Sequence, residues 1–96
     1  MSSPSESDTD APRVTVRYWA AARAAAGRES DVVAAATLAE ALDAVRLLHR
    51  EHERFYRVIG VCSILLGAQP VGTRDPASVR LETGDVVEVL PPFAGG

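Results

Sequence analysis

Alternating apolar and polar residues predict β-strands near both ends of the chain. Residues 13–19 read RVTVRYW and residues 86–90 read VVEVL, and both segments are rich in β-branched or aromatic types. Successive side chains of a strand point to opposite faces. The positions expected to face the core are Val14, Val16, Tyr18, Val87 and Val89. The alternate positions, on the opposite face, include Trp19, Val86 and Leu90.

A different spacing predicts the main helix. The sequence TLAE at 37–40 is a capping box, in which the Thr37 hydroxyl accepts from the Glu40 amide and the Glu40 carboxylate reaches back. Apolar residues then recur at helical spacing; they are Leu38, Ala41, Leu42, Val45 and Leu48. The helix is expected to run to about His52, with His49 and His52 in a solvated last turn.

Shorter signals complete the element order. Alanines at 20–26 predict one or two helical turns that end at Gly27, and a weaker strand follows, ending near Ala35. The segment VCSILL at 61–66 predicts a buried strand with a short return strand at Val71. One helix packed on one face of a mixed sheet is an α+β arrangement. With the last strand parallel to the first, the order indicates a ubiquitin-like β-grasp fold.

Charge is concentrated before the first strand. Residues 1–12 hold three acids and no basic residue, whereas residues 13–96 hold ten arginines and ten acids. The first twelve residues therefore read as a disordered acidic tail, followed by a domain at 13–90 and an arm at 91–96. The chain shows no signal peptide, no apolar run long enough for a bilayer and no basic patch for nucleic acid. We expect a cytoplasmic protein.

Side chains that usually carry chemistry are scarce. Cys62 is the single cysteine and lies in an apolar segment, where it is expected to be buried as a small hydrophobe. The segment HREHE at 49–53 lacks the spacing of a zinc site and has no further ligand cluster, so no metal site is predicted. The sequence contains no lysine and therefore no side-chain amine that could be acylated.

The sequence ends VLPPFAGG. Pro91 and Pro92 cannot donate to a sheet ladder, so they end the strand and keep the chain extended. Ala94, Gly95 and Gly96 are thin enough to enter a narrow channel, and the Gly96 carboxylate is the unusual group that the arm presents. Adenylation would turn this carboxylate into an electrophile, and a sulfur donor could then displace AMP to leave a thiocarboxylate.

The chain resembles the MoaD-like small subunits of molybdopterin synthase, which are ubiquitin-like sulfur carriers. The similar segments are VTVRYWAAARAAAG at 14–27, TLAEAL at 37–42 and LETGDVVEVLPPFAGG at 81–96. The similarity extends over about residues 13–96.

The resemblance implies a carrier without catalytic side chains or a bound cofactor of its own. An E1-like, MoeB-like adenylyltransferase would use ATP to activate Gly96, and a sulfurtransferase would supply the sulfur. The arm would then enter the large, MoaE-like catalytic subunit, where sulfur passes to the cyclic pyranopterin precursor. Alternatives with the same ending are carriers for thiamine or cysteine synthesis, a ubiquitin-like protein modifier, and a binding module whose two glycines are accidental.

Large apolar groups near the arm suggest where the partner docks. Trp19 and Leu90 lie on the sheet face opposite the helix, and Phe93 lies on the arm, so all three are expected to anchor the catalytic subunit. The alternative is that Trp19 folds under the alanine-rich turns as part of the core.

Overall fold

The computed structural model describes residues 11–92 of the 96-residue chain. The strands are β1 (Arg13–Tyr18), β2 (Ser30–Ala34), β3 (Ser63–Leu66), β4 (Gln69–Pro70) and β5 (Val86–Leu90). The helices are α2 (Ala20–Ala26), α3 (Leu38–Leu48), α4 (Glu53–Ile59) and the short 3-10 helix η1 (Pro76–Ser78). Most of the predicted acidic tail (1–10) and the tip of the predicted arm (93–96) lie outside the described residues.

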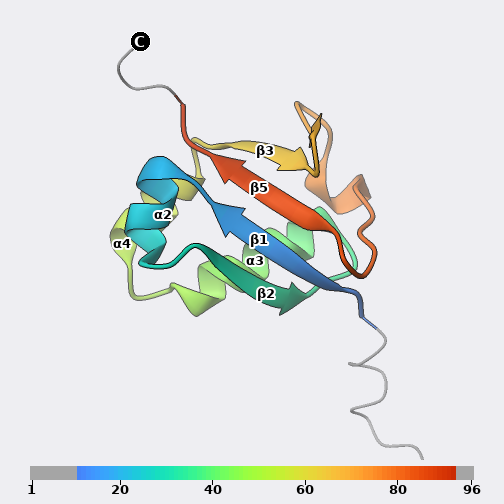
Figure 1. The fold of residues 1–96 in the computed structure, drawn as a ribbon, viewed down its shortest axis with the longest axis horizontal. Helices are drawn as coiled ribbons and strands as arrows, with labels where there is room; N and C mark the ends of the chain where they lie inside the picture. Colours follow the sequence, from blue (N-terminus) through green and yellow to red (C-terminus); the bar gives the residue numbers. More distant parts are fainter. Residues whose placement is uncertain (1–10, 93–96) are drawn as a thin grey trace, which may run out of the picture.

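The five strands form one mixed sheet in the order β2-β1-β5-β3-β4 (Figure 1). β1 pairs antiparallel with β2. It pairs parallel with β5, as the sequence predicts. β3 pairs antiparallel with β5 on the other side, and the two-residue strand β4 closes that edge. β5 is therefore the central strand, and the chain leaves the sheet from its end.

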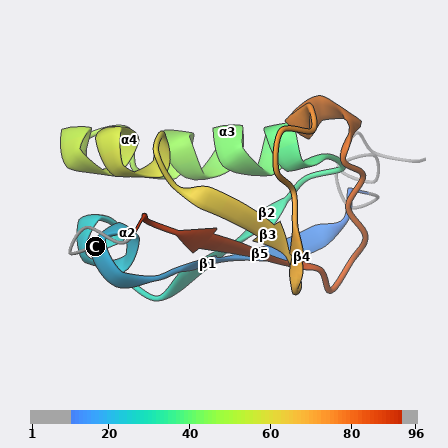
Figure 2. The same cartoon turned by 90° about the horizontal axis from the view of Figure 1, so that it is seen from above.

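The helices α3 and α4 form one layer over a single face of the sheet, and α2 lies at the end of the sheet (Figure 2). The side chains that alternation assigned to the core face are at most 2% exposed; they are Val14, Val16, Tyr18, Val87 and Val89. The α+β architecture of a β-grasp fold is thus confirmed. No described helix covers the opposite sheet face, which we call the open face.

The start of α3 matches the capping-box prediction. The Thr37 hydroxyl accepts a hydrogen bond from the Glu40 amide at 3.2 Å. The Glu40 carboxylate reaches back one residue further than a standard capping box requires and accepts from the Ala36 amide at 2.8 Å. Such a cap stabilises a helix by about 1 kcal/mol.

The predicted end of this helix is wrong. α3 stops at Leu48, and a separate helix, α4, begins at Glu53 and buries Phe55 and Ile59. Leu48, assigned to the apolar stripe, is 54% exposed. The buried position that the apolar stripe predicts for Leu48 is occupied by His49 instead.

His49 is a core residue, not part of a solvated last turn. Its side chain is 1% exposed, and its Nε2 lies 2.8 Å from Oδ2 of the buried Asp31. The Tyr18 hydroxyl donates to the same carboxylate oxygen at 2.7 Å. Arg28, whose side chain lies at the surface, donates to Oδ1 with a distance of 2.9 Å between the two atoms. The ring of His49 stacks on Phe55, with the centroids 4.4 Å apart.

These contacts join β1, β2, the end of α3 and α4 around one carboxylate. A buried charge is tolerated only when it is paired and hydrogen-bonded, and Asp31 has three partners. Among the described residues, every buried side-chain nitrogen and oxygen has a hydrogen-bond partner. The Asp31 network therefore stabilises the fold, because loss of the Asp31 carboxylate leaves the buried side chains of Tyr18 and His49 without this partner.

We predict that Asp31→Ala lowers the free energy of unfolding by about 3 kcal/mol, because His49 and Tyr18 keep their burial but lose their acceptor. Urea denaturation measures this change. Asp43→Ala is the matched control: Asp43 pairs with Arg46 at 3.5 Å and its side chain is 79% exposed, so its loss should cost under about 0.5 kcal/mol. Equal effects of the two substitutions would contradict the role given to Asp31.

Alkaline pH provides a second test. Burial, followed by the hydrogen bond to Asp31, raises the pKa of Tyr18 well above its ordinary value of 10.0. Above about pH 10 the unfolded chain then releases this proton before the folded chain does, so stability falls as pH rises, by up to about 1.4 kcal/mol per pH unit. We expect Tyr18→Phe to lower stability at pH 7 but to flatten its decline above pH 10. Burial also raises the pKa of Cys62, so a smaller decline should remain. An unchanged alkaline slope in Tyr18→Phe would show that Tyr18 ionises freely in the folded protein.

Candidate functional site

The candidate site is built where β5 ends and the arm begins. β5 ends at Leu90, followed by Pro91, which is partly buried, and Pro92, which is exposed. The other predicted site residues of the arm, which are Phe93, Ala94, Gly95 and Gly96, lie outside the described residues. The structure thus describes the root of the arm and not its tip.

The root of the arm is anchored on both sides. Leu90 pairs in register with Ser63 of β3, and Val89 pairs with Tyr18 of β1. Because a central strand is held by two ladders, its end is positioned more firmly than an edge strand or a loop would be. The arm therefore starts from a fixed point of the domain.

Trp19 lies beside this root. It follows β1 directly, and its backbone amide donates to the Val89 carbonyl at 3.1 Å. The side chain is not folded under α2: Trp19 is 43% exposed. The alternative of a core tryptophan is therefore wrong. Trp19 is held next to the place where the arm leaves, as the docking prediction requires.

Two charged residues contact the indole of Trp19. Its Nε1 donates to Oε1 of Glu88 at 2.7 Å, and the guanidinium carbon of Arg17 lies 5.2 Å from the ring centroid. Arg17 and Glu88 are register partners on β1 and β5, with 3.7 Å between Nη1 and Oε2. Arg17 and Trp19 lie two residues apart along one extended segment, so alternation places both on the same face. The contact with Glu88 could not be predicted, because it depends on the register between β1 and β5 and joins residues 69 apart in sequence.

The rest of the open face near the root is apolar or small. Leu90 and Val86 of β5 are half-buried, as is Leu65 of β3, which pairs with Glu88. Leu90 therefore retains exposed surface on the face where the sequence placed it.

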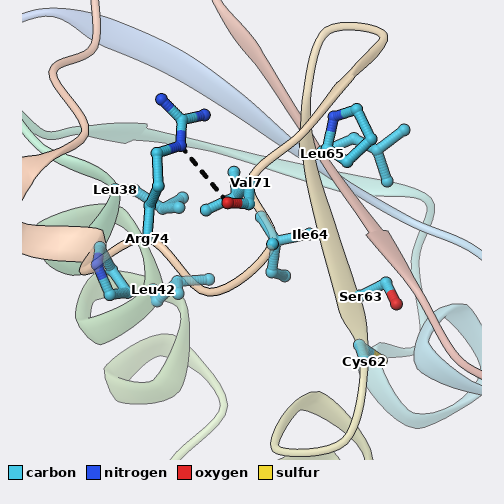
Figure 3. A pocket seen from close by; sticks show the side chains of 11 residues that line it. Leu38, Leu42, Cys62, Ser63, Ile64, Leu65, Val71 and Arg74 are labelled. Atoms are coloured by element: carbon cyan, nitrogen blue, oxygen red, sulfur yellow. Dashed lines mark hydrogen bonds between the residues drawn. The ribbon is translucent and has the colours of Figure 1, made fainter.

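A cavity of about 290 Å³ opens elsewhere, between α3 and the β3–β4 edge (Figure 3). Leu38, Leu42 and Ile64 line it, and Arg74 at its rim donates from Nε to the Val71 carbonyl at 3.3 Å. Neither Trp19 nor the described residues of the arm root line this cavity. The candidate site is thus an exposed face and an arm, not a pocket.

Cys62 lines the same cavity, and its surroundings do not activate it. Its thiol donates to the Val58 carbonyl at 3.1 Å, and burial raises its pKa. A reactive cysteine requires a lowered pKa. Within residues 11–92, no three metal-binding side chains gather, and no helix has the length and apolar character that a bilayer span requires.

Comparison with known proteins places this arrangement among related chains. The model of the ThiS family matches residues 16–96. No curated protein matches the chain. The family match includes both the open face and the arm.

Solved structures share the fold. A complex of subunits 1 and 2 of the molybdopterin-converting factor from Helicobacter pylori contains a chain 30% identical, with a TM-score of 0.61, covering 88% of this chain and 99% of that one. The small archaeal modifier protein 1 of Methanosarcina acetivorans is 20% identical with a TM-score of 0.73, covering 90% of this chain and 98% of that one. The corresponding protein of Haloferax volcanii is 23% identical with a TM-score of 0.72, covering 88% and 99%. At under 25% identity, these last two show a common fold only.

Proposed function

This chain belongs to the ThiS family of ubiquitin-like sulfur carriers and modifiers, and from that premise we propose that it carries sulfur for molybdopterin synthesis. The observation that carries the proposal is the ending PPFAGG directly after the central strand β5. The similarity to a subunit of a molybdopterin-converting factor, at 30% identity, supports it further.

In this role the Gly96 carboxylate is the reacting group. An E1-like enzyme joins it to AMP from ATP with release of pyrophosphate, which gives the carbonyl carbon a good leaving group. The persulfide of a sulfurtransferase then attacks the carbonyl carbon and AMP departs. A second thiol cleaves the resulting acyl disulfide, becoming oxidised to a disulfide itself, and a thiocarboxylate remains on Gly96. The sulfur is finally transferred to the cyclic pyranopterin precursor inside the large synthase subunit, which supplies the catalytic side chains.

The geometry of the described residues suits a carrier. The reacting end must reach into a partner's active site, and the six residues from 91 to 96 can extend roughly 20 Å. The arm starts from the firmly paired end of β5, with Trp19 and Leu90 beside it on the open face. A partner can therefore bind the open face while the arm enters the partner's active site.

Protein modification would use the same ending, and the similarity to known modifiers gives it less support. The two archaeal modifier proteins resemble this chain at 20% and 23% identity, which concerns the fold and not the target. The chain with the higher identity comes from the molybdopterin-converting factor. We therefore retain the carrier role as the proposal.

We predict that adding one alanine after Gly96 abolishes sulfur transfer, because the carboxylate would then sit one residue beyond the catalytic position. The assay contains the E1-like enzyme, ATP, the sulfur donor, the large subunit and the precursor, and follows dithiolene formation. Intact mass verifies that the extended protein is uncleaved. The melting temperature should equal that of the wild type. Dithiolene formation by the uncleaved, extended protein would refute the proposal.

The docking surface has its own test. We expect the double substitution Leu90→Ala and Phe93→Ala to weaken binding to the large subunit by about tenfold or more, with an unchanged melting temperature. Leu47→Ala is the matched control, because Leu47 is 62% exposed on α3 in the helix layer. Isothermal titration gives the affinities. An unaltered affinity, or unfolding of the isolated domain, would exclude this surface as the dock.

A further inference from the structure

Trp19 combines exposure with firm side-chain contacts. The residue is 43% exposed and is nevertheless hydrogen-bonded through the indole nitrogen. The acceptor is Glu88, whose side chain is only 18% exposed. Arg17 lies within the range of a cation–π contact. The indole is therefore held by two residues that belong to two different strands.

The backbone next to Trp19 is also constrained. Ala20 has φ of 50° and is the one non-glycine residue with positive φ in the described part of the chain. This conformation is costly for a residue with a Cβ atom. It turns the chain from β1 into α2 directly after Trp19, whose amide is bonded to β5. Backbone and side chain thus both restrict the orientation of the indole.

We propose that Arg17 and Glu88 are positioning residues that hold Trp19 in the orientation in which the sulfur-accepting partner binds it. We call this pair the Trp19 clamp. The inference rests on the proposed function for the identity of the partner, the large subunit of molybdopterin synthase. The orientation of the indole in the free protein does not depend on that identity.

The physical advantage is that the indole is ordered before binding. Ordering an interface side chain opposes association by an amount that corresponds to about 2- to 12-fold in affinity. Because the Trp19 clamp already orders the indole in the folded domain, this ordering does not have to occur on binding. It also leaves part of the indole exposed, beside the root of the arm, for the partner to cover. Tryptophans in such positions are common anchors of interfaces.

The first experiment uses the free, full-length protein and needs no partner. Trp19 is the single tryptophan of the sequence, so its fluorescence reports on this site alone. We expect Glu88→Ala to lower the fluorescence anisotropy and to raise quenching by acrylamide, with circular dichroism unchanged. Glu88→Gln keeps an oxygen that accepts from the indole and should remain closer to the wild type. Asp43→Ala removes a carboxylate from the helix layer and should change nothing.

The second experiment measures binding to the large subunit of molybdopterin synthase from the same organism. We expect Glu88→Ala to weaken binding about 3- to 10-fold, and Trp19→Ala to weaken it further. The decisive variant is Glu88→Ala combined with Trp19→Ala. If Glu88 acts through Trp19, the combination should bind as Trp19→Ala alone does, because residues that act as a unit are not additive.

The outcomes separate the clamp from the proposed function. Unchanged anisotropy and quenching in Glu88→Ala overturn the clamp while the carrier role stands. Additive losses in the combined variant show that Glu88 contacts the partner directly and also overturn the positioning role. If the wild-type protein does not bind the large subunit, the proposed function fails and the partner-binding part of the inference fails with it.

Discussion

The carboxylate of Asp31 is buried where the sheet meets the helix layer, and several features of the fold depend on it. Its oxygens lie within hydrogen-bond distance of Tyr18, His49 and Arg28. A carboxylate in that position must be paired, since desolvation without partners costs several kcal/mol. Meeting this requirement brings the end of α3 over β2. It also fixes His49 against Phe55 and thereby sets where α4 packs.

A second constraint is that the residues of β5 alternate between the core face and the open face of the sheet. Val87 and Val89 enter the core at 0% exposure, whereas Glu88 and Leu90 belong to the open face. The strand that stabilises the domain therefore also supplies the groups beside the arm. A substitution on the open face can alter recognition without opening the core, which is why binding and melting temperature are separable here.

The sequence predicted those parts of the fold that arise from local patterns. Alternation identified β1 and β5 with their correct faces, the TLAE motif located the start of α3, and Gly27 ends α2 with φ of 76°. The end of α3 was missed because nothing local marks it: no glycine or proline lies between Leu48 and Glu53. The break is stabilised by His49, whose partner Asp31 is 18 residues away. Phe55 and Ile59, spaced four apart, were the available sign of α4.

The candidate site divides in the same way. The ending after Leu90 and the exposed side of Trp19 could be predicted, because both depend on residues close in sequence. The contact between Trp19 and Glu88 joins residues 69 apart and follows only from the parallel pairing of β1 with β5. Sequence patterns assign a residue to a face, whereas register decides which residues on that face touch.

Arginine occupies all ten positions that hold a lysine or an arginine, and this has a chemical consequence beside the arm. Arg17 lies beside the root of an arm whose proposed tip carries an activated acyl group. A lysine there could attack that group in a neighbouring copy, whereas a guanidinium stays protonated and is a poor nucleophile. Arginine also contacts an aromatic ring and a carboxylate together, as Arg17 does with Trp19 and Glu88. The same residue type thus positions the indole and leaves the 96 residues without a side-chain amine that the activated terminus could acylate.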